Sequence, residues 1–305
     1  PGAYTVFRVE LFKGKSHFGE NAAFDETLPT NYLADEVIDD NKVDALLAKK
    51  YDETIVIAED DPEILAYLKD ELSTNFRVIA VNNGYDAVKA VMDNEVSLIL
   101  SDVLMPALNG FQLCSNIKSN IATCHIPIVL LTALSDDNQR IYGIAEGADE
   151  YIHKPFNMQY VRLKIIRIIE ERRRLADTFA QKFGRLTRHE AANLPCVDDV
   201  FRDKLFDLIE AQHSDSNFKI ELMSDMLGMS RILLYRKITS IFGMSPSDLL
   251  RNFRLQKAVQ LLTDQRRNVS EVAYTVGFSS PAYFAKCFKS VYNMTPTEYM
   301  YRTRE

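Results

Sequence analysis

The chain of 305 residues is long enough for two or three domains, and its hydrophobic fraction of 47% indicates globular packing. No stretch offers the roughly 18 to 20 uncharged apolar residues of a membrane-spanning helix, and no charged-then-apolar leader is visible. The 4 cysteines and 5 histidines show no metal-ligand spacing, which argues against a zinc site or a disulfide framework. We therefore expect this piece to be soluble in a reducing cytoplasm.

The net charge of -7 is unevenly distributed. Residues 54–170 carry 16 acidic and 9 basic side chains, whereas residues 199–305 carry 12 acidic and 15 basic ones. This contrast predicts two functions, with polyanion binding confined to the second half. Random variation in composition explains the small excess of basic over acidic side chains in residues 199–305 equally well, so charge alone does not establish nucleic-acid binding.

The first residues predict little independent structure. Residues 5–11 alternate apolar and polar side chains, which is typical of a strand. The residues up to 53 are rich in Asp, Glu and Asn, with a weak helical pattern at Val43, Leu46 and Leu47. We interpret residues 19–53 as an acidic linker.

From Thr54 the chain alternates short apolar runs with amphipathic stretches. The runs at 55–58, 78–81, 98–100 and 128–131 predict strands, and 151–152 can form a fifth. Helix-compatible segments follow them, one beginning at Pro62 and the last covering 158–171. Such alternation predicts a parallel sheet covered on both faces, over residues 54–171.

The second half is predicted to be helical throughout. A polar linker over 172–198 precedes helix-compatible segments in 199–305, which are separated by glycines and prolines and include no alternating strand pattern. We therefore expect an α/β domain followed by an all-α domain.

Four predicted strands end beside chemically reactive side chains. Glu59 and Asp60 follow the first strand, Asp102 closes the third, Thr132 follows the fourth, and Lys154 follows the fifth. Parallel sheets place their ligands at this edge, and clustered carboxylates stay ionised only when a cation compensates them. Mg2+ prefers such oxygen ligands, so Asp102 could attack a phosphorus centre while Thr132 and Lys154 bind the phosphoryl oxygens.

These positions and their flanks resemble a two-component response-regulator receiver domain. The resemblance is carried by Glu59-Asp60-Asp61, Ser101-Asp102-Val-Leu-Met-Pro106, Leu131-Thr132-Ala133 and Tyr151-Ile-His-Lys154-Pro155-Phe156. It implies a flavodoxin-like, doubly wound sheet of five parallel strands and a cis Lys154-Pro155 peptide. It further implies these roles: Asp102 as phospho-acceptor; Glu59, Asp60, Asp102 and the Leu104 backbone carbonyl as Mg2+ ligands; the Ala133 N–H and Lys154 as phosphate-binding groups; Thr132 and Tyr151 as switch residues.

An enzymatic alternative uses a similar aspartate. Haloacid-dehalogenase-like phosphatases place a second acid two residues after the nucleophile, as general acid and base. That position is Leu104 here, and Leu134, two residues after Thr132, is also apolar. We therefore expect no catalytic residue in this fragment and a phosphoryl-aspartate that hydrolyses slowly.

Two segments of the second half predict helices crossing at a glycine turn. Ser224 lies four residues before Gly228, and Ala273 lies four residues before Gly277. With the flanking motifs Leu233-Leu-Tyr-Arg-Lys237 and Met294-Thr-Pro296, these segments resemble the AraC-type DNA-binding domain. That family reads two successive major grooves, roughly 34 Å apart.

The resemblance nominates a base-reading set in each motif. The first set is Ser230, Arg231, Ile232, Tyr235 and Arg236, and the second is Ser279, Ser280, Pro281, Tyr283 and Lys286. Lys237, Lys289 and Arg254 are expected to contact phosphate or to stabilise the domain. Phe284 and Phe288 are expected to pack in the core. A phosphorelay or docking module without DNA binding remains the alternative.

Residues 1–18 resemble the end of a histidine-kinase ATP-binding domain, although Ala3 and Phe12 depart from it. A stray exposed strand is the alternative. The resemblance implies the C-terminal part of a hybrid sensor whose full-length chain has a kinase domain and an inner-membrane anchor. Expected partners are DNA, that histidine kinase domain, RNA polymerase, and a second copy, upon phosphorylation or within a dimeric sensor.

Overall fold

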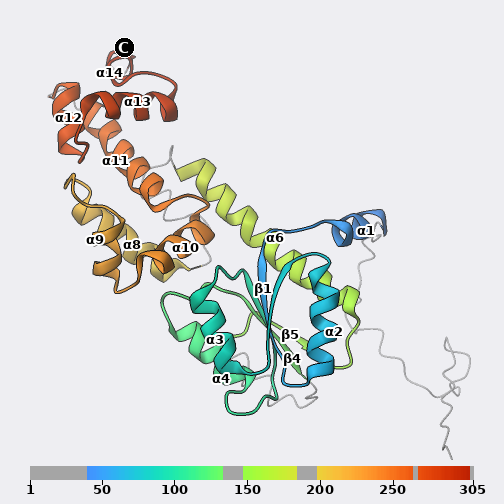
Figure 1. Cartoon of the computed structure of the whole chain (residues 1–305). Coiled ribbons are helices and arrows are strands. Elements are labelled where there is room, and N and C mark those ends of the chain that lie inside the picture. The colour runs from blue at the N-terminus through green and yellow to red at the C-terminus, as the bar shows by residue number, and fades with distance from the viewer. Residues whose placement is uncertain (1–39, 133–146, 184–197, 264–266, 303–305) are drawn as a thin grey trace, which may run out of the picture. The chain divides into compact units, whose positions relative to one another are not determined.

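The structure is a computed structural model that describes residues 40–132, 147–183, 198–263 and 267–302 (Figure 1). Two compact units divide the chain, residues 1–43 and 44–305, and the second holds the features that follow. The predicted strand at 5–11, the kinase-like segment 1–18 and Ala133 lie outside the described residues. Among the described helices, none is long and apolar enough to cross a membrane.

Five parallel strands form one sheet, as predicted. They are β1 (Thr54–Ala58), β2 (Arg77–Val81), β3 (Leu98–Asp102), β4 (Ile128–Thr132) and β5 (Glu150–His153), in the order β2-β1-β3-β4-β5. Every neighbouring pair is parallel. All residues of β3 and β4 are buried, which explains why these strands read as continuous apolar runs rather than alternating ones.

Helices cover both faces of the sheet. Ile55 and Ile57 of β1 pack with α2 (Pro62–Ser73) and α6 (Met158–Phe183), whereas Val56 and Ala58 pack with α3 (Gly84–Asp93) and α4 (Gly110–Ser119). This alternation follows from the twofold side-chain period of a strand. The predicted start at Pro62 is confirmed, and Asp61 caps α2 by accepting from the Glu63 and Ile64 N–H groups.

The predicted linker over residues 19–53 is wrong for its last ten residues, 44–53, which pack on the receiver. The helix α1 (Asp40–Ala48) precedes Tyr51, which is 6% exposed and stacks on Phe76 at 5.2 Å. The Asn75 amide donates to the carbonyls of Leu47 and Lys49, at 2.8 and 2.7 Å. These residues are therefore part of the receiver packing, and a composition rich in polar residues concealed it.

The linker expected over 172–198 is also wrong in its first part. Helix α6 continues past the predicted end at 171 to Phe183. Ile165 and Ile169 are buried against the sheet, whereas Phe179 and Phe183 are buried among the helices of the second half. The apolar stripe thus continues through a segment whose arginines suggested a linker. Arg173 and Arg174 are exposed, whereas Arg172 forms an ion pair with Asp149 of the receiver at 2.8 Å.

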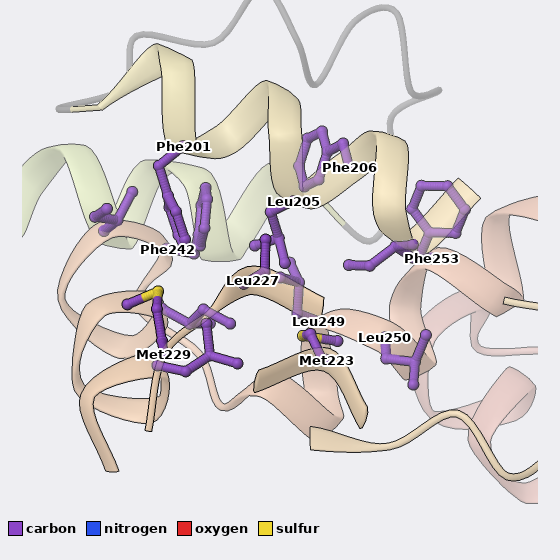
Figure 2. Close-up of a cluster of buried hydrophobic side chains, with 14 of the residues drawn as sticks. Phe201, Leu205, Phe206, Met223, Leu227, Met229, Phe242, Leu249, Leu250 and Phe253 are labelled. Carbon is purple, nitrogen blue, oxygen red and sulfur yellow. The ribbon is translucent and has the colours of Figure 1, made fainter. Parts of the chain in front are cut away.

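The second half is helical, as predicted. Its helices are α8 (Asp199–Gln212), α9 (Ile220–Leu227), α10 (Arg231–Phe242), α11 (Pro246–Thr263), α12 (Val269–Thr275), α13 (Pro281–Tyr292) and α14 (Pro296–Arg302). Figure 2 shows the first of its two cores, in which Phe201 and Phe206 of α8 face Phe242 of α10 and Phe253 of α11. The second core joins α11 to α14 and buries Phe284 and Phe288 completely, which confirms their expected packing role.

Both helix-turn-helix crossings turn at the predicted glycines. Gly228 and Gly277 have φ of +67° and +88°, in the left-handed region. The Met229 N–H donates to the Ser224 carbonyl and the Phe278 N–H to the Ala273 carbonyl, at 3.0 and 2.9 Å. The small residues Ser224 and Ala273, four positions before the glycines, thus accept the hydrogen bond that closes each turn.

Gly228 and Gly243 provide a matched test of the contact between α10 and α6. Both have positive φ, +67° and +65°, but a Cβ at Gly228 meets nothing within 4 Å, whereas one at Gly243 lies 2.8 Å from the Ala176 carbonyl oxygen. We expect Gly228→Ala to lower the free energy of unfolding by about 1 kcal/mol, because alanine is strained at positive φ. Gly243→Ala should cost about 1–3 kcal/mol more, because overpacking is added. Urea unfolding measures both, and equal losses would contradict the close approach of α6.

His125 predicts a pH dependence of stability. Its side chain is 7% exposed, and burial, followed by the positive charges of Lys237 and Arg172, lowers its pKa to about 3. His125 of the unfolded chain therefore binds a proton near pH 6.5, whereas His125 of the folded chain stays neutral at that pH. Its contribution to the free energy of unfolding is present above pH 6.5 and is lost as the pH falls below it. As the pH falls from 7.5 to 5.5, protonation of His125 in the unfolded chain should lower the free energy of unfolding by about 1.4 kcal/mol. Unfolding of His125→Gln should lack that share, and identical pH profiles for both proteins would refute it.

Candidate functional site

The predicted acidic residues meet at one edge of the sheet. Glu59 directly follows β1 and Asp102 ends β3, while Lys154 follows β5 with its N–H donating to the Thr132 carbonyl at 2.7 Å. The carboxylate oxygens of Glu59, Asp60 and Asp102 come within 4.8 Å of one another. Parallel topology is the cause, because it brings the carboxyl ends of strands far apart in sequence to the same edge.

Lys154 holds two of these acids together. Its ammonium lies 2.8 Å from a Glu59 oxygen and 3.2 Å from an Asp102 oxygen. Burial lowers the Lys154 pKa, but the hydrogen bond that Lys154 donates to Glu59 and the negative charges of Asp102 and Glu59 raise it overall. Burial raises the pKa of Glu59, and Asp102 adds to this, against the opposing bond from Lys154. One ammonium thus pairs with two of the three clustered carboxylates, which leaves the site with a net negative charge.

A divalent cation bound by Glu59, Asp60 and Asp102 could balance this excess negative charge. Glu59 and Asp102 are 1% and 7% exposed, whereas Asp60 lies open to solvent. Two buried oxygen donors and one exposed donor suit Mg2+, which uses few carboxylates and keeps several waters. The ligand role expected of the Leu104 carbonyl remains a prediction; the Leu104 side chain is 59% exposed.

The predicted switch residues also lie near this edge. Thr132 is 5% exposed at the end of β4, and its neighbour Leu131 is in register with Asp102. Tyr151 is half-buried in β5, in register with Leu130. The Lys154-Pro155 peptide is cis, as expected.

Gly110 positions the turn after Asp102, a contribution that the sequence analysis did not assign. Its N–H donates to the Val103 carbonyl at 3.0 Å, and a Cβ there would lie 2.4 Å from the Asp102 carbonyl oxygen. Only glycine allows α4 to start this close to the Asp102 backbone. The Asn109-Gly110 pair, a common turn signal, was the available clue.

Most of the nominated reader residues are available to a ligand. In the first motif Ile232 and Tyr235 are 63% and 48% exposed, and Arg231 makes a surface ion pair with Glu221 at 3.3 Å. In the second, Tyr283 is 51% exposed, and Ser279 and Lys286 are also exposed. Both motifs therefore present polar and aromatic side chains to solvent.

Some nominated residues have structural roles instead. The hydroxyls of Ser230 and Ser280 accept from the N–H groups of Leu233 and Tyr283, both at 3.3 Å, and so cap α10 and α13. Pro281 occupies the first turn of α13, where a missing N–H costs nothing. These three residues set where α10 and α13 begin.

Of the expected phosphate contacts, Lys237 and Arg254 belong to the interior packing. Lys237 is 0% exposed and forms an ion pair with Asp198 at 2.6 Å, and its ammonium also contacts the Ile121 carbonyl. Arg254 donates to the His213 and Asp215 carbonyls, at 2.8 and 2.7 Å. The stabilising alternative therefore holds for both residues in this structure.

Two family models match the chain. The model described as a response regulator receiver domain matches residues 55–166, and the model described as a helix-turn-helix domain matches residues 223–302. The chain thus carries a receiver domain followed by an AraC-type helix-turn-helix domain.

Two curated proteins are similar to the chain. The chain is 35% identical over 316 residues to "Histidine kinase P4" of Formosa agariphila, covering 99% of this chain and 22% of the relative. It is 38% identical over 113 residues to "Transcriptional regulatory protein GltR" of Pseudomonas aeruginosa, covering 37% of this chain and 47% of the relative. The chain thus spans less than half the length of either relative.

A solved receiver domain of a signal transduction histidine kinase from Syntrophus aciditrophicus is 34% identical, with a TM-score of 0.38. The match covers 39% of this chain and 91% of that one.

Divalent-cation binding can be tested through stability. Because a ligand stabilises the state that binds it, Mg2+ at tenfold its dissociation constant should raise the free energy of unfolding by about 1.4 kcal/mol. Asp60→Asn should reduce this gain, because it removes one of the three candidate ligand carboxylates. Asp61→Asn is the matched control: Asp61 caps α2 outside the cluster, and asparagine caps equally well. Equal Mg2+ responses of the two variants would exclude the proposed ligand set.

Proposed function

We propose that the chain is a phosphorylation-controlled, DNA-binding transcription regulator. Asp102 is the phospho-acceptor in this proposal, and the two helix-turn-helix motifs bind DNA sequence-specifically. The observation that carries it is the meeting of Asp102, Lys154, Glu59 and Asp60 at one sheet edge, in a chain whose helices α10 and α13 both present nominated readers to solvent.

Phosphoryl transfer would proceed by attack of an Asp102 carboxylate oxygen on phosphorus. The new oxygen–phosphorus bond forms as the bond to the donor breaks, and the donor leaves with its electron pair; a phosphohistidine of a kinase domain is the proposed donor. Lys154 then exchanges its contact with Asp102 for a phosphoryl oxygen, and the Thr132 hydroxyl and Ala133 N–H bind others. Glu59, Asp60, Asp102 and the Leu104 carbonyl would hold Mg2+, which would neutralise negative charge on the phosphoryl group.

The arrangement supports an acceptor rather than a phosphatase. The residue two positions after Asp102 is Leu104, whose exposed alkyl side chain can neither take nor give a proton. A water attacking the phosphoryl group therefore lacks a general base at this position. We propose that the fragment catalyses no turnover and that its phosphoryl group is lost slowly.

Sequence-specific DNA binding is supported by Arg231, Ile232 and Tyr235 on α10 and by Ser279, Tyr283 and Lys286 on α13. Arginine recognises guanine through two hydrogen bonds, and the other side chains contact base edges or methyl groups. We further propose a histidine kinase domain in the same full-length chain, as the name and coverage of the Formosa relative suggest. A second copy of the chain and RNA polymerase complete the proposed partners.

Phosphorylation is tested with acetyl phosphate and Mg2+, followed by intact-mass measurement. The chain should gain one phosphoryl group, and Asp102→Asn should gain none, because an amide oxygen is a poor nucleophile. Asp61→Asn, which preserves the cap of α2, should be modified like the parent. Modification of Asp102→Asn to the parent level would exclude Asp102 as acceptor.

DNA binding is tested with duplexes selected by the chain from a random pool. Loss of a base-reading arginine typically removes about 1–3 kcal/mol of discrimination. In the chain phosphorylated with acetyl phosphate, Arg231→Ala/Arg236→Ala should therefore weaken binding of the selected duplex roughly tenfold or more. Lys69→Ala/Arg77→Ala removes two exposed charges from the receiver and should have little effect. Failure of the parent chain to retain any duplex at low salt would favour the protein-docking alternative.

A further inference from the structure

Arg236, a nominated base reader, is bound by the receiver domain. Its guanidinium donates to three consecutive backbone carbonyls: to Met92 at 3.2 Å, to Asp93 at 3.0 Å and to Asn94 at 3.0 Å. These residues form the end of α3 and the position that follows it. The last carbonyls of a helix lack helical partners and carry the negative end of its dipole, so a guanidinium satisfies both their hydrogen bonding and their charge.

The neighbouring residues of α10 hold the same flank of the helix against the receiver. Lys237 contacts the Ile121 carbonyl and lies 3.2 Å from the Cys124 sulfur. At the C-terminal cap of α10, Gly243 leaves no room for a side chain against α6. Ala122 is buried in the same core as Leu234 and Ile238 of α10. The contact made by Arg236 is therefore part of a packed interface.

The remaining readers face elsewhere. Ile232 and Tyr235 of α10 are 63% and 48% exposed, and Tyr283 of α13 is 51% exposed. Ser279 and Lys286, at the start and middle of the second reader, are exposed as well. Among the nominated readers of α10, Arg236 is thus the one that contacts the receiver, whereas Ser279, Tyr283 and Lys286 of the second motif are open to solvent.

We infer that the end of α3 is a docking surface for α10, and that it competes with the DNA major groove for Arg236. A guanidinium fork donating to three carbonyls has no donors aligned for the two acceptors of a guanine, and the α3 backbone occupies the space in front of it. The docked chain binds DNA through α13, and release of Arg236 adds the groove read by α10. This inference rests on the proposed DNA binding and adds to it the surface that restrains one reader.

The test is to weaken the receiver side of the contact without altering a reader. Asp93→Lys replaces an exposed acid, on a residue whose carbonyl holds Arg236, with a cation that repels the guanidinium. On the selected duplex, the unphosphorylated full chain with Asp93→Lys should bind at least roughly fivefold more tightly, as is typical of coupling between sites. Its hydroxyl-radical footprint should lengthen by about one helical turn. Asp70→Lys makes the same charge change on exposed α2 and should behave like the parent.

Two outcomes would overturn the inference. The first is that Asp93→Lys binds with unchanged affinity and footprint, although thermal unfolding shows that this variant is folded like the parent. The second is an equal gain when Asp93→Lys is introduced into Arg236→Ala, because the gain would then come from the added charge and not from a released arginine. If the parent chain selects no duplex at all, the proposed DNA binding fails instead, so the two failures are distinguishable.

Discussion

One continuous helix, α6, is the constraint on which the rest of this structure depends. Its first half buries Ile165 and Ile169 against the sheet of the receiver, and its second half buries Phe179 and Phe183 with the helices around α10. A helix that supplies side chains to two cores cannot turn in one without transmitting that motion to the other. The acidic site and the first reader helix are therefore connected through packed side chains rather than by a linker alone.

The acidic site depends on an imbalance of charge. Lys154 compensates Glu59 and Asp102, while Asp60 adds a third carboxylate at the solvent side. A site with more acids than ammonium groups attracts a cation, and a cation then permits the approach of an anionic phosphoryl group. The chemistry proposed for Asp102 follows from these neighbours, since an isolated aspartate at a strand end has no such preference.

Helix α10 has two surfaces with different partners. Arg231, Ile232 and Tyr235 are open to solvent, whereas Arg236 and the buried Lys237 face the receiver and the Asp198 carboxylate. Residues adjacent in sequence thus belong to different surfaces, because each step along a helix turns the side chain by about 100°. The position of Arg236 at the border between these surfaces makes it sensitive to both.

The sequence by itself determined the order of strands and helices, the members of the acidic site and the two glycine turns. These depend on local periodicity, on glycine at positive φ and on the rule that parallel strands end at a common edge. The tertiary structure alone decided that residues 44–53 pack on the receiver, that α6 runs on to Phe183, and that Asp198 neutralises Lys237. It also decided that Arg236 binds the end of α3. The acceptors of Arg236 are backbone carbonyls distant in sequence, and because every residue carries such a carbonyl, no pattern of side chains could have pointed to them.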